Sequence, residues 1–362
     1  MTRLLHSLLT AVLLFAVGCK EDGSAGGTEG VALYVFDSTS NSVMVWNDLS
    51  ALYDSATVPA PSYTFGPNVL KEKVSNLAWG GMCLDAPHGI LYLVSETGAI
   101  VRWSNIRSQA SSVPSNEIVS FSLDNSSRLT NGTFGQVAID SQTDTLLITE
   151  TGDNGTRIWI VANASQKNQN DSIPLGTPLQ MTGDKGGTGV AASGGIVYAY
   201  MDDGDSVVGP LGEQFTGSRL RKGSTSAFDP TLVMLGDKTG LHKYGSLALD
   251  TAGGRLFVGV HNTDASVTTA PIQVFQTGQF GTGGYNQAPT LGAIGSPTDQ
   301  ATLRVLSHAG TKDWLAGLRG QGSAGYPTVL LWKSPLGGTA AKVISLDSSV
   351  VIKGVALDGN AS

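Results

Sequence analysis

Four short phrases of apolar and small residues, each ending in Asp, recur along the chain. They read Met82-Cys83-Leu84-Asp85, Val137-Ala138-Ile139-Asp140, Leu247-Ala248-Leu249-Asp250 and Val355-Ala356-Leu357-Asp358, and Val190-Ala191-Ala192-Ser193 is a degenerate copy. The last residue of each phrase recurs every 53 to 57 residues as far as Asp250, and Asp358 lies about two such steps further on. This spacing predicts the inner strand of a repeated β-sheet unit.

A second apolar strand follows most of these phrases after a short turn. It begins six residues after the Asp, as Leu91-Tyr92-Leu93-Val94, Leu146-Leu147-Ile148-Thr149 and Leu256-Phe257-Val258. Only four residues follow Asp358, and the matching strand, Leu33-Tyr34-Val35-Phe36, lies at the other end of the sequence. A repeat that is split between the two termini indicates a closed ring of β-sheets.

A third strand that carries an aromatic residue completes the pattern in five units. Its copies are Val43-Met44-Val45-Trp46, Ile100-Val101-Arg102-Trp103, Ile158-Trp159-Ile160-Val161, Gln273-Val274-Phe275 and Leu330-Leu331-Trp332. We therefore predict an all-β, six-bladed β-propeller over residues 30–362. Pairing of the C-terminal strand with the N-terminal strands in one blade (350–358 with 31–48) is expected to close it. The other blades centre on 81–103, 136–161, 189–201, 246–275 and 303–332.

The N-terminus has the pattern of an export signal. Arg3 precedes an apolar run from Leu8 to Val17, which is too short to span a bilayer but suits the core of a signal peptide. Ala16-Val17-Gly18-Cys19 resembles the bacterial lipoprotein signal, although Ala16 stands where Leu is usual. The resemblance implies a signal peptide over residues 1–18 and lipidation of Cys19; the alternative is an ordinary secretory signal followed by a chance Cys.

Residues 19–29 are polar and rich in Gly, which predicts a flexible tether between the lipid and the folded domain. The expected location is therefore the bacterial cell envelope, with the membrane as a partner through the anchor. Lys20 is not the Asp of an inner-membrane retention signal, so the resemblance favours the outer membrane, on its periplasmic or its outer side. Cys83, the only other Cys, fills a position held elsewhere by Ala, so we interpret it as a packing residue.

The overall composition excludes one class of partner. The chain has 47 Gly among 362 residues, 14% charged residues and a formal net charge of −7. Abundant Gly suits short strands and tight turns. The acidic balance, without a basic cluster, excludes nucleic acid as an expected partner.

Across residues 30–362 the repeated phrase, small residue, aliphatic residue and Asp followed by Leu-Tyr-Val, resembles the NHL-repeat and gluconolactonase-like superfamily of six-bladed propellers. That resemblance implies the fold but not one activity, since the superfamily includes lactonases, quinone-dependent dehydrogenases and non-catalytic binding proteins. The calcium ligands of the lactonases are not transferred. Glu29 precedes the first strand, but the Glu-Gly-Pro motif that carries the family's first ligand is absent.

Polar residues fall on two faces of such a ring. We interpret Asp85, Asp140, Asp250 and Asp358 as residues that shape turns by accepting bonds from nearby backbone N–H groups. On the opposite face, the alignment of second strands brings a set of polar residues toward one channel mouth: Asp37, Glu150, Asp202, His261, Asn262 and Arg319. These residues form a possible ligand site, with Ca²⁺ as a possible cofactor and no other cofactor expected; the alternative is solvated loop polarity.

One segment departs from the repeat. Residues Asp202 to Pro230, with Arg219, Arg221 and Lys222, are expected to form a long loop that either binds a partner or is a tolerated insertion. The sequence lacks a coherent catalytic set. It therefore favours a non-catalytic, lipid-anchored binding or scaffold protein that presents one propeller face to a protein or saccharide. The alternative is a Ca²⁺-dependent, lactonase-like hydrolase that acts in the central channel.

Overall fold

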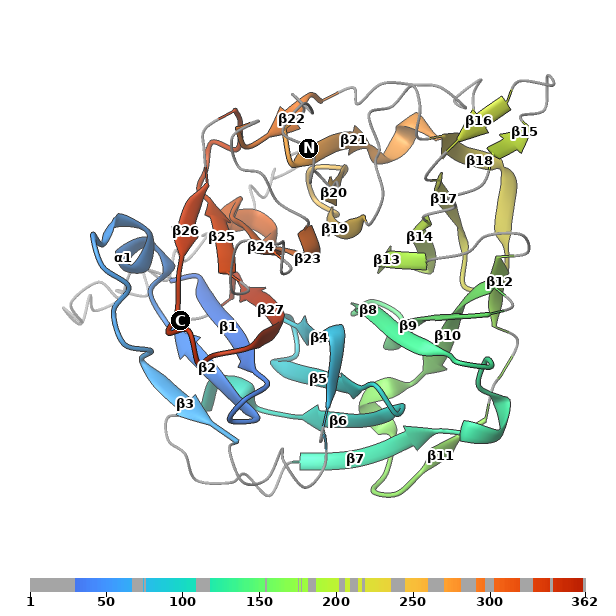
Figure 1. Cartoon of the computed structure of the whole chain (residues 1–362), viewed down its shortest axis with the longest axis horizontal. Coiled ribbons are helices and arrows are strands. Elements are labelled where there is room, and N and C mark those ends of the chain that lie inside the picture. Colours follow the sequence, from blue (N-terminus) through green and yellow to red (C-terminus); the bar gives the residue numbers. More distant parts are fainter. Residues whose placement is uncertain are drawn as a thin grey trace, which may run out of the picture.

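The fold is a ring of six β-sheets (Figure 1). The computed structural model describes residues 30–66, 74, 76–108, 118–153, 155–174, 176, 178–181, 187–201, 206–208, 214–216, 219–235, 245–259, 270–280, 291–296, 303–319, 328–338 and 341–360. Each sheet is one blade, with strands A to D from the centre outward. The chain is thus an all-β, six-bladed propeller, as the repeat predicts.

The first three blades are built as follows. Blade 1 contains β27 (Ile352–Asp358), β1 (Ala32–Asp37), β2 (Ser42–Trp46) and β3 (Tyr63–Phe65), with helix α1 (Leu49–Asp54) between its last two strands. Blade 2 contains β4 (Leu77–Asp85), β5 (Ile90–Ser95), β6 (Ala99–Trp103) and β7 (Ile118–Leu123). Blade 3 contains β8 (Thr133–Asp140), β9 (Thr145–Gly152), β10 (Gly155–Ala162) and β12 (Leu179–Met181).

The other three blades follow the same order. Blade 4 contains β13 (Gly187–Ser193), β14 (Ile196–Met201), β17 (Arg219–Ser224) and β18 (Phe228–Leu235). Blade 5 contains β19 (Ser246–Asp250), β20 (Arg255–Gly259), β21 (Ile272–Gln276) and β22 (Ala293–Ile294). Blade 6 contains β23 (Leu303–His308), β24 (Leu315–Arg319), β25 (Thr328–Trp332) and β26 (Lys342–Ile344).

The ring closes within blade 1. Strand β27 pairs antiparallel with β1, with Leu357 opposite Leu33 and Val355 opposite Val35. The innermost strand of the blade therefore comes from the C-terminal end of the chain and the other three from the N-terminal end. This pairing confirms the predicted closure of the ring.

Each blade packs against both of its neighbours. Six clusters of buried apolar side chains lie within the described residues, one at each interface between adjacent blades. In β1, Leu33 and Val35 face blade 6, whereas Tyr34 and Phe36 face blade 2. Because both faces of a blade are buried, its strands read as continuous apolar runs instead of alternating ones.

Blades 2 and 3 have an additional link. Strand β11 (Ser172–Ile173), in the connection between the third and fourth strands of blade 3, pairs parallel with β7, the outer strand of blade 2. Gln169 reinforces the link, since its Oε1 accepts a bond from Ser120 N at 2.8 Å and its Nε2 donates to Ser120 Oγ at 2.9 Å. The crossing covers part of an outer edge that would otherwise be free to pair.

Blade 4 corrects one expectation. Arg219, Arg221 and Lys222 lie in β17, the third strand of the blade, so the prediction that they belong to a long loop is wrong. The inserted connection is shorter, between β14 and β17, and it contains the hairpin of β15 (Ser206–Val208) and β16 (Gln214–Thr216). Lys222 of blade 4 also contacts blade 5, because its Nζ donates a hydrogen bond to Thr277 O at 3.0 Å.

Two further predictions concern Cys83 and the membrane. Cys83 packs against the apolar cluster between blades 2 and 3, and burial, with Asp85 nearby, raises the pKa of its thiol. It is therefore a packing residue, as predicted. Within the described part of the chain, no helix is long and apolar enough to cross a membrane. The predicted signal peptide (residues 1–18) and all of the tether (19–29) lie outside the described residues.

Candidate functional site

The Asp residues that end the inner strands shape the turns, as predicted. Asp140 Oδ1 accepts a bond from Gln142 N at 3.1 Å, Asp358 Oδ1 from Asn360 N at 2.9 Å and Asp250 Oδ1 from Gly253 N at 2.9 Å. In the fourth turn, Asp85 Oδ2 lies 2.8 Å from His88 Nδ1. We call this side of the ring, where the turns between strands A and B lie, the A–B turn face.

Three of these carboxylates also join neighbouring blades, which the sequence does not reveal. Asp358 in blade 1 accepts bonds from Arg107 Nε and Nη2 of blade 2 at 2.7 and 2.8 Å. Asp140 in blade 3 accepts bonds from Gly194 N and Gly195 N of blade 4 at 3.0 and 2.7 Å. The hydrogen bond to Asp358 raises the pKa of Arg107, so the guanidinium stays charged over the physiological range.

The third contact between neighbouring blades is made by Arg255. Arg255 Nε donates to Asp250 Oδ2 at 2.8 Å within blade 5, and its Nη2 donates to Asp313 Oδ1 of blade 6 at 2.5 Å. Burial alone would raise the pKa of Asp313, but the bond and charge of Arg255 hold it below its usual value. Asp250, Asp313 and Asp358 are thus paired with arginines, whereas Asp140 is bound by backbone N–H groups.

A hollow lies at the centre of the A–B turn face, and we call it the bowl. Its volume is about 390 Å³, and all six blades contribute to its lining. The aliphatic part of the lining comes from the residue before the end of five inner strands: Leu84, Ile139, Ala192, Leu249 and Leu357. Uncharged polar side chains complete the lining: Ser141, Gln142, Ser193, Thr251 and Asn360. The bowl thus offers an aliphatic surface and hydroxyl and amide groups.

In blade 6 the inner strand ends in a histidine, His308. His308 pairs with the first residue of β24, in the position that Asp85, Asp140 and Asp250 occupy in their blades. Its side chain is 1% exposed, and its Nδ1 accepts a bond from Gly310 N at 3.2 Å. Its Nε2 lies 3.6 Å from Asp313 Oδ1, beyond ordinary hydrogen-bonding distance.

The charge state of His308 follows from its surroundings. Burial lowers the pKa of the imidazole, with Arg255 acting in the same direction and Asp250 and Asp313 opposing. The ring packs against Phe257, with 5.0 Å between centroids. Since Asp250 is paired with Arg255 and His308 is neutral at physiological pH, the described lining of the bowl carries no uncompensated charge.

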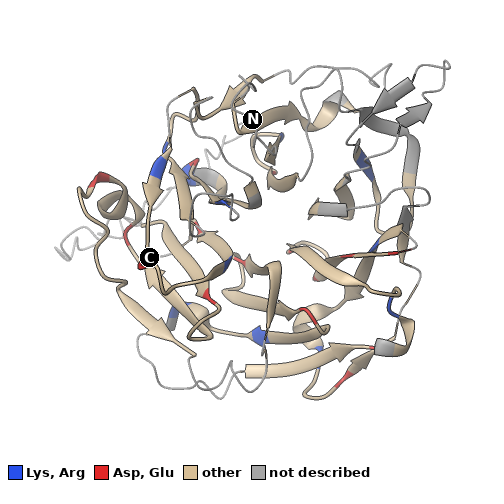
Figure 2. Cartoon of the chain, in the orientation of Figure 1, with Lys and Arg blue, Asp and Glu red and all other residues tan. Residues whose placement is uncertain are grey.

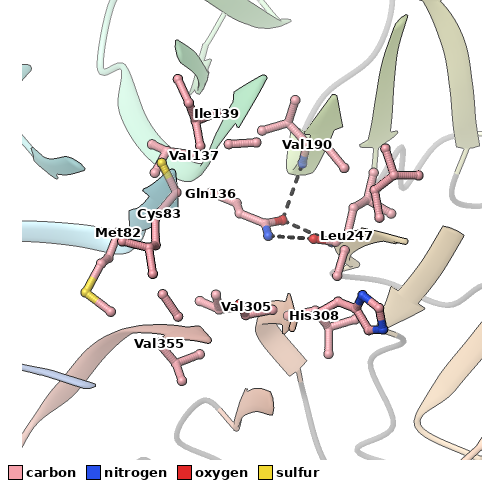
Figure 3. Close-up of a pocket in the computed structure, with 18 of the residues that line it drawn as sticks. Met82, Cys83, Gln136, Val137, Ile139, Val190, Leu247, Val305, His308 and Val355 are labelled. Atoms are coloured by element: carbon pink, nitrogen blue, oxygen red, sulfur yellow. Dashed lines mark hydrogen bonds between the residues drawn. The ribbon is translucent and has the colours of Figure 1, made fainter. Parts of the chain in front are cut away.

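A second cavity, of about 150 Å³, lies deeper along the ring axis and is lined by the inner strands (Figure 3). Gln136 of β8 spans it: Nε2 donates to Leu247 O at 2.9 Å, and Oε1 accepts bonds from Leu247 N at 3.0 Å and Val190 N at 3.3 Å. The amide thus joins the inner strands of blades 3, 4 and 5. None of the described residues that line this cavity is a carboxylate.

The residues predicted to form a site on the opposite face belong to three blades where they are described. Asp37 ends β1, Glu150 lies in β9 and Arg319 ends β24. None of these three lines the bowl or the deeper cavity. Asp202, His261 and Asn262 lie outside the described residues, so the convergence of the six stays a prediction.

Glu150 accepts hydrogen bonds from blade 3 and from the connection that leads into it. It is fully buried, and its Oε2 accepts bonds from Arg157 Nε at 2.8 Å and Trp159 Nε1 at 2.7 Å. Its Oε1 accepts a bond from Leu129 N at 3.0 Å. This carboxylate thus fixes the connection between β7 and β8 onto blade 3, a structural use that the sequence pattern did not indicate.

Asp37 also has local partners. Its Oδ1 accepts a bond from Thr39 N at 2.8 Å, and its Oδ2 accepts one from Ser40 Oγ at 2.5 Å. It thus shapes the turn between β1 and β2. Among the described residues, no group of three or more His, Cys, Asp or Glu side chains is placed to hold a metal ion. Calcium binding and the hydrolase alternative stay predictions.

Comparison with known proteins adds the fold alone. No family model and no curated protein matches the sequence. A chain of the nidogen–laminin complex aligns with a TM-score of 0.52 at 10% identity, covering 91% of this chain and 98% of that chain. A gluconolactonase from Xanthomonas campestris aligns at 0.42 and 12% identity, covering 75% and 78%, and the Dos1 propeller at 0.41 and 10%, covering 89% and 68%. The first likeness supports the propeller class.

The bowl could have been found from the repeat itself. The residue before the end of each inner-strand phrase is Leu84, Ile139, Ala192, Leu249 or Leu357, and these side chains converge because equivalent positions in a closed ring surround one axis. The sequence argument looked instead for irregular polar positions. His308 had no comparable signal, because β23 does not match the phrase well enough to align.

Proposed function

We propose that this protein is a non-catalytic, lipid-anchored binding protein of the bacterial cell envelope, and that its A–B turn face receives a protein partner. The bowl is the observation that carries the proposal. An aliphatic floor gains free energy when it is covered, at about 25 cal/mol per Å² of apolar surface removed from water. The hydroxyl and amide groups beside it offer hydrogen bonds to a partner's backbone.

The lining favours a protein over a saccharide. The described lining contains no Phe, Tyr or Trp whose ring could stack on the apolar side of a sugar, whereas Leu84, Ile139 and Leu249 suit an aliphatic or aromatic side chain. A volume of about 390 Å³ exceeds that of one such side chain, so the bowl has room for a protruding loop. We therefore assign it an apolar side chain on a loop of the partner.

The second part of the proposal is a lipid anchor at Cys19. Lipidation of Cys19, after removal of residues 1–18, would hold the propeller at a membrane through the polar segment 19–29. An outer-membrane location follows from Lys20 as the residue after the lipidated Cys. Substitution Cys19→Ser tests the anchor, since it should abolish fatty-acid labelling and release the protein from the membrane fraction. Equal labelling of the variant would contradict the lipoprotein proposal.

Photo-crosslinking tests the binding surface. A photoreactive phenylalanine analogue placed at Gln142 or Thr251, beside the bowl, should give one defined protein adduct in intact cells. The same analogue at Thr97 or Asp153, in turns on the opposite face, is the matched control and should give little of that adduct. Adducts from the control positions alone would contradict the proposal, and an adduct that glycosidases but not proteases degrade would identify a saccharide partner instead.

A further inference from the structure

The chain enters the propeller beside the bowl. Strand β1 begins at Ala32, which pairs with Asp358, the last residue of β27. Gly359 and Asn360, which follow directly, belong to the lining of the bowl. Val31 is fixed at this position, because its carbonyl accepts a bond from Leu49 N at 3.0 Å. Any segment that precedes residue 30 therefore starts from the A–B turn face.

The predicted tether is short compared with the ring. Residues 19–29 would span at most about 36–40 Å if fully extended, and a Gly-rich coil of this length spans about 17–20 Å on average. To bring the opposite face to the membrane, the tether would have to pass two outer strands at about 4.8 Å each and then run along a strand of about 17–20 Å. That path of about 30 Å exceeds the average span, so ordering the tether along it costs entropy.

The turns around the bowl can approach lipid headgroups without an electrostatic penalty. Asp85, Asp140, Asp250 and Asp358 are all buried. Pro87, Gln142, Thr251 and Asn360 are exposed beside them and carry no charge, and the exposed cation Arg107 is paired with Asp358.

The opposite face differs. It exposes Asp153 and Asp347 on its connections, and anionic headgroups would repel these carboxylates, whereas its Glu96 is paired with Lys353 Nζ at 3.0 Å. The exposed carboxylates of the A–B turn face, Asp48 and Asp54, lie away from the bowl, on the outer connection between β2 and β3. In the described residues, charged positions of both signs are distributed around the ring (Figure 2). The neutral centre of the A–B turn face is thus the better match to a lipid surface.

We infer that the A–B turn face is the membrane-facing surface of the anchored protein, so that the bowl opens toward the bilayer. The partner it fits is a protein of the same membrane that exposes an apolar side chain on a loop at the lipid surface. The inference rests on the proposed anchor at Cys19. It goes further, since an anchored binding protein could equally present its recognition face to the aqueous side.

Energy transfer to labelled lipids tests this orientation. The acylated protein, carrying Cys83→Ala, is reconstituted in phosphatidylcholine–phosphatidylglycerol vesicles that contain a headgroup acceptor dye. Donor dyes are attached at Gln142→Cys or Thr251→Cys on the A–B turn face, and at Thr97→Cys or Asp153→Cys on the opposite face. Since the faces are separated by a strand length of about 17–20 Å, transfer from the first pair should be about twice as efficient as from the second.

Equal transfer from both pairs, or stronger transfer from Thr97 and Asp153, would overturn the inference. Failure of the anchor is distinguishable, because an unacylated protein would not float with the vesicles at all. In that case Cys19 can be coupled to a maleimide lipid in chains that carry Cys83→Ala and an azide-bearing amino acid, instead of Cys, at the position of the donor dye, so that the lipid has no second thiol to attach to. The same comparison of the four positions then decides the orientation without natural lipidation.

Discussion

The two faces of the ring use their carboxylates in different ways. On the A–B turn face, Asp140 and Asp358 bind donors on the next blade, so repetition of one short phrase also joins the blades. On the opposite face, Asp37 closes its own turn and Glu150 holds a neighbouring connection in place. The regular face is left with a neutral hollow on its axis. Asp37 and Glu150, by contrast, accept hydrogen bonds from donors in nearby strands and connections.

This difference reverses a common expectation. Variable polar loops on a rigid scaffold are usually the first place to look for a site. In this propeller Asp37 and Glu150 of the variable face have local structural partners, whereas equivalent residues of the repeat converge on the axis. Equivalent positions of the repeated strands can therefore form a site, because the closed ring places them around one axis.

Removal of the strand common to both faces should have the largest effect. Deletion of residues 350–362 takes away β27, which pairs with β1 and supplies Val355 and Leu357 to buried clusters. The exposed edge and apolar surface should make the protein aggregate or melt at a much lower temperature. Differential scanning calorimetry of the truncated and full chains provides the measurement. Equal melting temperatures would show that the termini do not share a blade.

Glu150 tests the structural role assigned to the opposite face. Replacement Glu150→Gln removes the charge that faces buried Arg157, and loss of one partner of a buried pair costs about 3–5 kcal/mol. Urea unfolding should show this loss, whereas exposed Asp153→Asn on the same face should change stability by less than about 0.5 kcal/mol. An unchanged stability for Glu150→Gln would return this residue to the candidate ligands. Calcium-dependent melting of the wild type would support the same conclusion.

Asp358 gives the corresponding test on the A–B turn face. Replacement Asp358→Asn weakens the bond to Arg107, which is partly exposed, so we expect a smaller loss of about 1–3 kcal/mol. Exposed Asp153→Asn again serves as the control. If Asp358→Asn and Asp153→Asn have equal effects in urea unfolding, the strand-end carboxylates do not join the blades energetically.

His308 should make the smallest contribution, visible in the pH dependence. Because burial lowers its pKa in the folded protein, the unfolded chain binds a proton first as the pH falls through about 6.5. Its contribution to stability is therefore present above that pH and lost below it, by at most about 1.4 kcal/mol per pH unit until the folded-state pKa is reached. Unfolding from pH 7.5 to 5 should show less pH dependence for His308→Asn than for His88→Asn, and equal profiles would contradict this role.

Much of the fold could be predicted from the sequence because both faces of every blade are buried. The phrases ending at Asp85, Asp140 and Asp250, and the split between Leu33 and Leu357, each mark a strand directly. Blade 4 was harder, because its third strand begins with Arg219 and contains Arg221 and Lys222, which read as loop residues. Contacts between blades, such as Arg107 with Asp358, join positions 251 residues apart, and no local pattern marks such a pair.

The most direct test of the account is whether the bowl, and not the opposite face, receives the partner. Photo-crosslinking from Gln142 is measured in cells that carry either Thr251→Trp, which places a bulky ring beside the bowl, or Thr97→Trp, which places it on the opposite face. We predict that Thr251→Trp lowers the adduct yield by about tenfold or more, equivalent to a cost of about 1.4 kcal/mol in binding. Thr97→Trp should leave the yield unchanged. Equal yields from the two variants, or a loss confined to Thr97→Trp, would contradict the assignment of the bowl.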